Sequence, residues 1–293
     1  MDLAIVGAGT MGAGIAQIAV QHGLSVALHD AVPEGLERGV ARVYDGLGRL
    51  LERRRITASE HDAALARLSI ASSLTELASA PFVIEAVPED LGLKHILFKN
   101  LDAVCAPSAI LASNTSSISV TRIAAAARSP ERVVGMHFFN PVYALKLVEV
   151  VAGHLTSNET LAAVEALATR LGKTPVRAKD TPGFIVNRVA RPFYGEALRI
   201  LAEGVPVETI DRVMRAGGGF PMGPFELMDL IGIDVNFAVT KSVYDAFFGE
   251  PRYRPHPIQD RMVAAGTLGK KTGRGFYRYD EAGAKIGEDD AQR

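Results

Sequence analysis

The sequence of 293 residues predicts an α/β fold, in which a doubly wound, mostly parallel sheet with a helical hairpin insertion precedes a smaller all-α domain. Short apolar runs alternate with amphipathic stretches from residue 2 to about residue 178. The strand-like runs then stop near Asp180, and helical periodicity takes over. The length also exceeds the size at which one hydrophobic core usually stops growing. We therefore expect a first domain over residues 1–181 and a second over residues 182–293.

Eight strands are expected in the first domain. In chain order they cover residues 2–6, 25–29, 68–71, 82–87, 109–113, 133–138, 146–152 and 174–177. Between the second and third strands, apolar residues recur at helical spacing, at Leu36, Val40, Val43, Leu47 and Leu50. Thr57 and Glu60 then match a capping box that opens a second short helix. These two helices would form the hairpin that projects from the sheet.

The second domain is expected to contain helices only. The helix-period segments cover residues 184–203, 206–216, 224–231, 234–248 and 257–266. The polar tail from Glu281 onward is expected to fray.

Composition excludes several classes of protein. The formal net charge is -1, from 32 basic and 33 acidic residues, so no global field draws the chain to nucleic acid or an anionic membrane. No stretch is long and apolar enough for a membrane span. The single cysteine, Cys105, excludes an intramolecular disulfide and a cysteine-based metal cluster. A strand begins at residue 2, which leaves no room for a targeting segment. We expect a cytoplasmic protein without a metal.

A glycine motif follows the first strand. Gly7-Ala8-Gly9-Thr10-Met11-Gly12 fits GxGxxG and opens an apolar helix, the context in which this motif binds a dinucleotide in a Rossmann-like fold. Gly7 allows the tight turn, Gly9 lets the backbone approach a pyrophosphate, and Gly12 lets the helix pack on the strand. Thr10 and Met11 begin the helix whose N-terminus faces the negative charge.

An acid ends the second strand. Asp30 stands about 20 residues beyond the glycines, where a carboxylate accepts from the ribose 2′-hydroxyl and selects NAD over NADP. A helix N-cap is the alternative role for Asp30. Glu89, Lys94 and Asn114 also follow strands that end at this edge of the sheet, where ligands bind in such folds. Each could instead be a cap or a solvated side chain.

A second constellation of polar residues lies later in the chain. Glu149 stands inside the apolar strand segment 146–151, where an unpaired charge would cost several kcal/mol. His137 is the expected partner. A carboxylate on one imidazole nitrogen fixes the tautomer and leaves the other nitrogen to act as a general base or acid in the oxidation of an alcohol. A hydrogen-bonded core histidine is the structural alternative.

The chain resembles the 3-hydroxyacyl-CoA dehydrogenase family, particularly its single-function bacterial 3-hydroxybutyryl-CoA dehydrogenases, over nearly its whole length. The shared motifs are GAGTMGAGIAQ at 7–17, EAVPED at 85–90, SNTSS at 113–117, GMHFFNPV at 135–142, KLVEVV at 146–151, TPGFIVNRV at 181–189, GPFELMDLIGID at 223–234 and GKKTGRGFY at 269–277.

The resemblance implies reversible, NAD-dependent oxidation of a short-chain (3S)-3-hydroxyacyl-CoA. It implies that His137 is the acid and base, that Glu149 orients it, and that Ser116 and Asn187 donate hydrogen bonds to the substrate oxygen. Residues that correspond to cofactor contacts are Asp30, Glu89, Lys94, Ser116, Asn140 and Lys271. The resemblance also implies a homodimer formed through the helical domain. Taken alone, Asn187 could be an ordinary packing residue.

The expected coenzyme A contacts depart from the family pattern. The family holds coenzyme A on the helical hairpin with a serine and a basic residue, and Gly46 and Arg53 occupy these two positions. Arg53 and its two neighbouring arginines could bind phosphates through their guanidinium groups, or could form a solvated helix end. The acyl chain length and the pathway stay open, and 3-hydroxyadipyl-CoA is among the possible substrates.

Two other functions stay open. One is a dehydrogenase of a free hydroxy acid, of the gulonate or carnitine type. The other is a catalytically silent NAD(H)-binding protein. The joint presence of His137, Glu149, Ser116 and Asn187 disfavours the silent protein, because NAD binding does not require that set.

Overall fold

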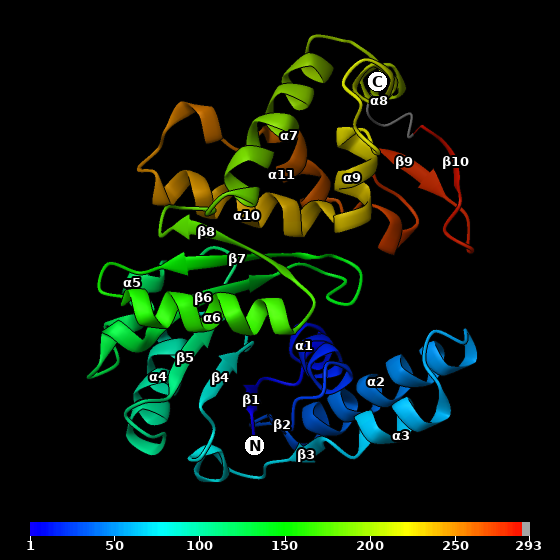
Figure 1. Ribbon diagram of the computed structural model, residues 1–293. Coiled ribbons are helices and arrows are strands. Elements are labelled where there is room, and N and C mark those ends of the chain that lie inside the picture. Colours follow the sequence, from blue (N-terminus) through cyan, green and yellow to red (C-terminus); the bar gives the residue numbers. More distant parts are fainter. Residues whose placement is uncertain (289–293) are drawn as a thin grey trace. The chain divides into compact units, whose positions relative to one another are not determined.

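The computed structural model describes residues 1–288, and the chain divides into two compact units. The first spans Met1–Phe184 and the second begins at Ile185. Figure 1 shows the sheet of the first unit with helices packed along it. Within residues 1–288, no helix has the length and apolar character that crossing a bilayer demands.

The sheet of the first unit has eight strands in the order β3-β2-β1-β4-β5-β6-β7-β8. The strands are β1 (Leu3–Val6), β2 (Val26–His29), β3 (Leu68–Ile70), β4 (Phe82–Glu85), β5 (Ile110–Ser113), β6 (Val133–Phe138), β7 (Leu147–Ala152) and β8 (Thr174–Lys179). All neighbours are parallel except β6 and β7, which are antiparallel. The predicted doubly wound sheet is confirmed, and the chain reverses direction across the sheet between β1 and β4, where such folds bind ligands.

Helices connect these strands. The α-helices are α1 (Thr10–Gln21), α2 (Pro33–Glu52), α3 (Ala58–Leu65), α4 (Leu91–Val104), α5 (Val120–Ala124) and α6 (Asn158–Arg170), and the 3-10 helices are η1 (Leu74–Leu77) and η2 (Pro130–Arg132). The predicted hairpin is α2 and α3. Thr57 and Glu60 form the expected capping box at the start of α3, because each side chain accepts from the other residue's backbone amide.

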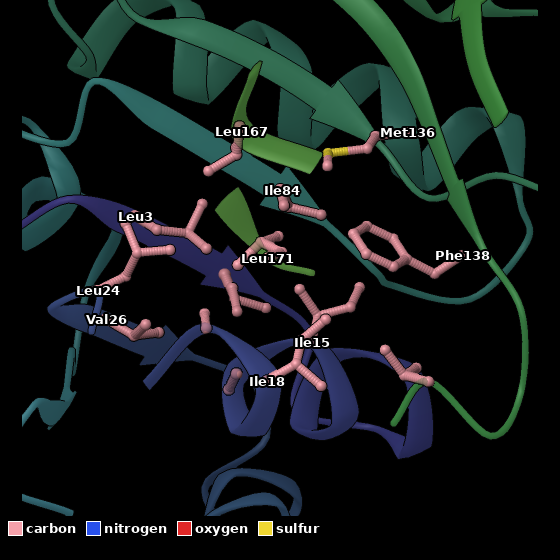
Figure 2. Packing of buried hydrophobic residues seen from close by; sticks show 14 of the residues in the cluster. Leu3, Ile15, Ile18, Leu24, Val26, Ile84, Met136, Phe138, Leu167 and Leu171 are labelled. Carbon is pink, nitrogen blue, oxygen red and sulfur yellow. The ribbon is translucent and has the colours of Figure 1, made fainter. Parts of the chain in front are cut away.

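The sheet is buried on both faces. Successive strand residues point to opposite faces, so Leu3 and Ile5 join one apolar cluster while Ala4 and Val6 join another. Figure 2 shows the first cluster, in which Ile15 from α1 packs beside residues of the strands. A parallel sheet needs such cover on both sides. The two cores hold the strand ends, and therefore the loops that follow them, in fixed positions.

The second unit is helical, as predicted, but not only helical. Its helices are α7 (Val186–Ala202), α8 (Val207–Ala216), α9 (Pro224–Ile231), α10 (Ile233–Ala246) and α11 (Pro257–Ala264), with the 3-10 helices η3 (Pro251–Tyr253) and η4 (Lys270–Thr272). It also contains an antiparallel pair of short strands, β9 (Tyr277–Tyr279) and β10 (Lys285–Glu288).

This strand pair corrects two expectations. The prediction of an all-α second domain missed it, because two runs of three and four residues are too short to show a strand period. The tail from Glu281 was expected to fray, yet β10 pairs with β9. Asp229 accepts from the backbone amides of Phe276 and Tyr277, both at 2.9 Å, which ties β9 to α9. The expected fraying beyond residue 288 lies outside the described residues.

Candidate active site

The glycine loop lies between the end of β1 and the start of α1. Gly7 has φ +99°, and a Cβ there would lie 2.6 Å from the carbonyl oxygen of Ala86, so only glycine fits. A Cβ on Gly12 would lie 1.8 Å from the carbonyl oxygen of Gly7, which shows how closely helix and loop pack. A Cβ on Gly9 would meet no atom within 4 Å. The loop is therefore closed toward the protein and open at Gly9.

The N-terminus of α1 suits an anion. Its N-cap is Gly9, whose missing side chain leaves the first amides without a cap, and no acidic residue stands in the first turn. Uncapped amides and the helix dipole favour negative charge at this point. Thr10 and Met11 form the first turn. The loop and helix thus fit the pyrophosphate of a dinucleotide.

Asp30 follows β2 and faces the same loop. Its Oδ2 accepts from the amide of Ala8 at 2.7 Å, and its Oδ1 accepts from the amide of Val32 at 2.9 Å. Each carboxylate oxygen has a second lone pair, so Asp30 can hold the loop and still accept from a ribose hydroxyl. The side chain is thus both a structural clamp and a possible ligand contact.

A cavity of about 810 Å³ opens beside these residues in the first unit. Pockets for cofactors typically measure about 300–1,000 Å³. Its lining includes the whole glycine loop, Asp30, and the apolar side chains of Leu93, Ile96 and Leu97 from α4. The size and the mixture of glycine backbone, one carboxylate and apolar wall fit a dinucleotide.

Sequence reasoning missed several polar residues of this cavity. His29, Arg38, Arg42 and Asn100 all line it. Arg38 and Arg42 stand one turn apart on α2, and the spacing of four residues could have indicated that they share a face. His29 is buried, and its Nδ1 lies 2.9 Å from the carbonyl oxygen of Ala71.

His137 and Glu149 meet directly. The antiparallel register of β6 and β7 places them opposite one another, and His137 Nδ1 lies 2.6 Å from Glu149 Oε2. Only 6% of His137 is exposed, and Glu149 is fully buried. The predicted contact is therefore confirmed. An ionised carboxylate only accepts, so the proton of a neutral imidazole sits on Nδ1 and Nε2 carries a lone pair.

Aromatic rings surround this histidine. The ring of Phe139 lies 4.4 Å from the His137 ring, and that of Phe184 lies 5.9 Å away, measured between centroids. These rings and the strand pairing restrict rotation of the imidazole. The pair is therefore held in one orientation, as an acid or base requires.

The loop after β5 is organised by Glu89. Its Oε1 accepts from the hydroxyl of Thr115 at 2.7 Å and from the amides of Ser116 and Ser117, both at 2.9 Å. Burial by itself would raise the pKa of Glu89, but the charge of Lys94 and these hydrogen bonds lower it. Glu89 is thus ionised at neutral pH and holds Ser116 in place.

Lys94 belongs to the same network and reveals a residue that sequence reasoning did not assign. Its Nζ lies 2.6 Å from Glu85 Oε1 and 3.4 Å from Glu89 Oε2, and the Lys94 side chain is 1% exposed. Glu85 is fully buried and also accepts from the Ser113 hydroxyl at 2.6 Å. The signal was available, because an acid at the end of an apolar strand needs a partner just as Glu149 does.

Asn114 links two strand ends, because its Oδ1 accepts from the amide of Phe138 at 2.8 Å. It therefore connects the loop after β5 to the end of the strand that carries His137. Asn140 lies just beyond that strand and is exposed. Arg53 ends α2 and is also exposed.

The remaining expected site residues lie in the second unit. Asn187 stands in the first turn of α7. Lys271 pairs with Asp234, with Nζ 2.6 Å from Oδ1 and 2.7 Å from Oδ2.

The sheet order, the glycine loop and the cavity together define a dinucleotide-binding protein of the Rossmann class. Comparison with known proteins narrows this class. Residues 2–181 match the family described as "3-hydroxyacyl-CoA dehydrogenase, NAD binding domain", and residues 183–279 match "3-hydroxyacyl-CoA dehydrogenase, C-terminal domain". The chain belongs to the 3-hydroxyacyl-CoA dehydrogenase family, and its cofactor is NAD.

Individual relatives agree with this assignment. The chain is 50% identical to 3-hydroxyadipyl-CoA dehydrogenase of Escherichia coli over 94% of its length, although it spans only 58% of that protein. It is 46% identical to a probable 3-hydroxybutyryl-CoA dehydrogenase of Bacillus subtilis, with 96% of this chain and 98% of the relative covered. The crystal structure of (S)-3-hydroxybutyryl-CoA dehydrogenase from Ralstonia eutropha superposes with a TM-score of 0.92 at 44% identity, covering 96% of this chain and 99% of that one.

Proposed function

We propose that the protein catalyses the reversible, NAD-dependent oxidation of a short-chain (3S)-3-hydroxyacyl-CoA, such as 3-hydroxybutyryl-CoA, to the 3-ketoacyl-CoA. The observation that carries this proposal is the buried contact of 2.6 Å between His137 and Glu149 in a chain of this family. A structural histidine needs no carboxylate as its partner. Because burial of both groups costs free energy, a catalytic role explains why the pair is present.

His137 is the general base in the oxidation. With its Nδ1 proton directed at Glu149, Nε2 takes the proton of the substrate hydroxyl, and Glu149 stabilises the imidazolium that results. NAD, when bound, accepts the hydride. In the reverse direction His137 returns the proton. Ser116 and Asn187 donate hydrogen bonds to the substrate oxygen.

Most of the proposed cofactor contacts lie in the first unit. Gly7, Gly9, Gly12 and the first turn at Thr10 and Met11 receive the pyrophosphate, supported by the open position at Gly9. Asp30 accepts from the ribose.

The other proposed cofactor residues fall into two groups. Glu89, Lys94 and Asn114 support the cofactor site through their contacts with the loop that carries Ser116. Asn140 and Lys271 are proposed as further contacts.

Arg53 is proposed to pair with a phosphate of coenzyme A. Gly46, at the position where the family has a serine, is buried against Gln17, and a Cβ there would lie 2.1 Å from Gln17 Oε1. Gly46 therefore packs against Gln17 and offers no hydroxyl group to coenzyme A at this position. The recognition of coenzyme A then depends on the arginines at the end of α2.

We also propose that two copies associate through the second unit and that the protein works in the cytoplasm. Large apolar side chains are exposed on this unit, among them Val189 at 66% and Val213 at 59%. The molar mass in solution tests the dimer. The one cysteine, Cys105, is free and buried, which suits a reducing compartment.

The proposed activity is tested by NADH oxidation with acetoacetyl-CoA, run beside free acetoacetate. We expect turnover with the thioester only. The variant His137→Gln should lower kcat by about 10²–10⁴-fold, because it removes the base, while NADH affinity stays nearly unchanged. Turnover of acetoacetate instead would indicate a free-acid dehydrogenase. NADH binding without any turnover would indicate a silent binding protein.

A further inference from the structure

Arg191 is a buried cation whose partners in the protein are all neutral. It lies on α7 and is 5% exposed. Its Nε donates to the carbonyl oxygen of Asn187 at 3.1 Å, and its Nη1 donates to the carbonyl oxygen of Asn236 at 3.1 Å and to Thr240 Oγ1 at 2.9 Å. The guanidinium also lies 4.9 Å from the centre of the Tyr194 ring. Burial lowers the pKa of Arg191 to about 10, so it is still protonated at neutral pH.

Two other buried cations among the described residues have a counterion, whereas the buried Lys173 donates to the carbonyl oxygens of Val142 and Leu145. Lys94 pairs with Glu85 at 2.6 Å, and Arg132 pairs with Asp102 at 2.7 Å. Arg191 pairs with no carboxylate among residues 1–288. A buried charge without a counterion costs several kcal/mol. A ligand that supplies a carboxylate would remove this cost.

The surroundings of Arg191 lack an acceptor as well as a charge. Within the described part of the chain, Nη2 of Arg191 donates to no residue. Asn236 is 2% exposed, and its Nδ2 has no hydrogen-bond partner in the structure, while its Oδ1 accepts from Gln259 at 2.8 Å. Thr240 donates to the carbonyl oxygen of Asn236. One buried donor, Asn236 Nδ2, thus lacks an acceptor, and the positive charge of Arg191 lacks a counterion. A carboxylate meets both needs.

The position of Arg191 on the helix relates it to the substrate. It stands four residues after Asn187, so both side chains lie on the same face of α7, separated by about 6 Å along the axis. If Asn187 contacts the oxygen on C3, a group three carbons further along the acyl chain lies about 4 Å beyond C3, at about 1.5 Å per bond. The hydrogen bonds that the substrate makes with Asn187 and with Arg191 account for the difference between these two distances.

We propose that Arg191, assisted by Asn236, binds a carboxylate at the far end of the acyl chain, and that the preferred substrate is the coenzyme A thioester of a six-carbon 3-hydroxy dicarboxylic acid. This inference rests on the proposed function, because it takes Asn187 as a contact to the substrate oxygen. The carboxylate accepts from Nη2 and neutralises the buried guanidinium. A chain that ends in a methyl group leaves that charge without a partner.

The test compares two substrates of equal carbon number, 3-hydroxyadipyl-CoA and 3-hydroxyhexanoyl-CoA, which end in a carboxylate and a methyl group. The wild-type protein should show a kcat/KM about 10–100-fold higher for the dicarboxylic thioester, as expected for a hydrogen-bonded charge pair. In Arg191→Met this preference should disappear, because kcat/KM falls for 3-hydroxyadipyl-CoA and stays unchanged for 3-hydroxyhexanoyl-CoA. Arg191→Lys keeps the charge but not the planar fork and should retain part of it.

Arg188→Met provides the matched control. Arg188 is an exposed arginine on the same helix, and its Nε donates to the Tyr253 hydroxyl at 3.3 Å. Its removal should leave the ratio of the two kcat/KM values unchanged. Activity of Arg191→Met on 3-hydroxyhexanoyl-CoA shows that the variant is folded.

The outcomes separate this inference from the proposed function. Equal turnover of both thioesters by the wild-type protein would overturn the role of Arg191 and leave the dehydrogenase activity standing. If Arg191→Met lowered kcat/KM equally for both substrates, the role of Arg191 would be purely structural. Turnover of neither six-carbon thioester would overturn the inference about Arg191. The proposed function itself would be refuted only if acetoacetyl-CoA also gave no NADH oxidation.

Discussion

Single residues in this protein often serve two neighbours at once. Asp30 accepts from the amides of Ala8 and Val32, and it also lines the cavity. Glu85 holds Lys94 and Ser113 in the same way. A substitution at such a position therefore changes both the loop and the ligand site. Variants that keep shape and remove charge are the most informative.

At this scale, Asp30→Asn should relax the choice between NAD and NADP. The amide no longer repels a 2′-phosphate, and Arg38 and Arg42 of the same cavity can attract one. The side-chain oxygen can accept from only one of the amides of Ala8 and Val32, so the other amide loses its acceptor. We expect the NADP affinity to rise about tenfold relative to that of NAD, which corresponds to roughly 1.4 kcal/mol. Calorimetric titration with both dinucleotides measures it. Unchanged discrimination would show that another group selects the cofactor.

Elements of the first unit depend on local caps as well as on the core. Helix α3 has eight residues, only one of which, Ala64, is buried. A helix this short is marginal by itself. The capping box at Thr57 and Glu60 satisfies backbone amides that packing leaves free.

Thr57→Ala should therefore lower the free energy of unfolding by about 1 kcal/mol, the usual loss for an N-cap side chain. Urea denaturation gives this value, and activity should be unaffected. Ser59→Ala in the first turn of the same helix is the control, because no side-chain hydrogen bond of Ser59 is seen in the described part of the chain and alanine favours a helix. An equal effect of the two substitutions would rule out the capping mechanism.

At the scale of the whole molecule, stability at low pH depends on buried ion pairs between distant segments. Asp102 on α4 is 4% exposed and binds Arg132 at 2.7 Å and Arg128 at 2.8 Å, which ties α4 to the segment before β6. Burial by itself would raise the pKa of Asp102, but hydrogen bonds from Arg128 and Arg132 lower it from 3.8 to about 2. The ionised form is thus favoured in the folded state.

The sign of the pH effect follows from this shift. Because the folded pKa lies below the unfolded one, the contribution of Asp102 is present above pH 3.8 and is lost as the pH falls through about 2. It amounts to roughly 2 kcal/mol. Asp102→Asn should remove this part of the pH dependence, as measured by urea denaturation between pH 4 and pH 2. Asp62→Asn, at an exposed carboxylate, is the control. A constant difference between wild type and Asp102→Asn across this range would contradict the assignment.

Sequence alone determined the positions of the eight strands of the first unit, the helical hairpin, the helices of the second unit and the glycine loop, but not the strands β9 and β10. These positions depend on the periodicity of apolar residues along the chain and on backbone conformations such as the positive φ of Gly7. Both can be recognised from residues that are neighbours in the sequence. It also indicated that Glu149 needed His137. The antiparallel register that brings the two together, the contact of Lys94 with Glu85, and the neutral surroundings of Arg191 were decided by the tertiary structure. Each of these joins segments that are apart in the chain, so its energy depends on packing that no local pattern records.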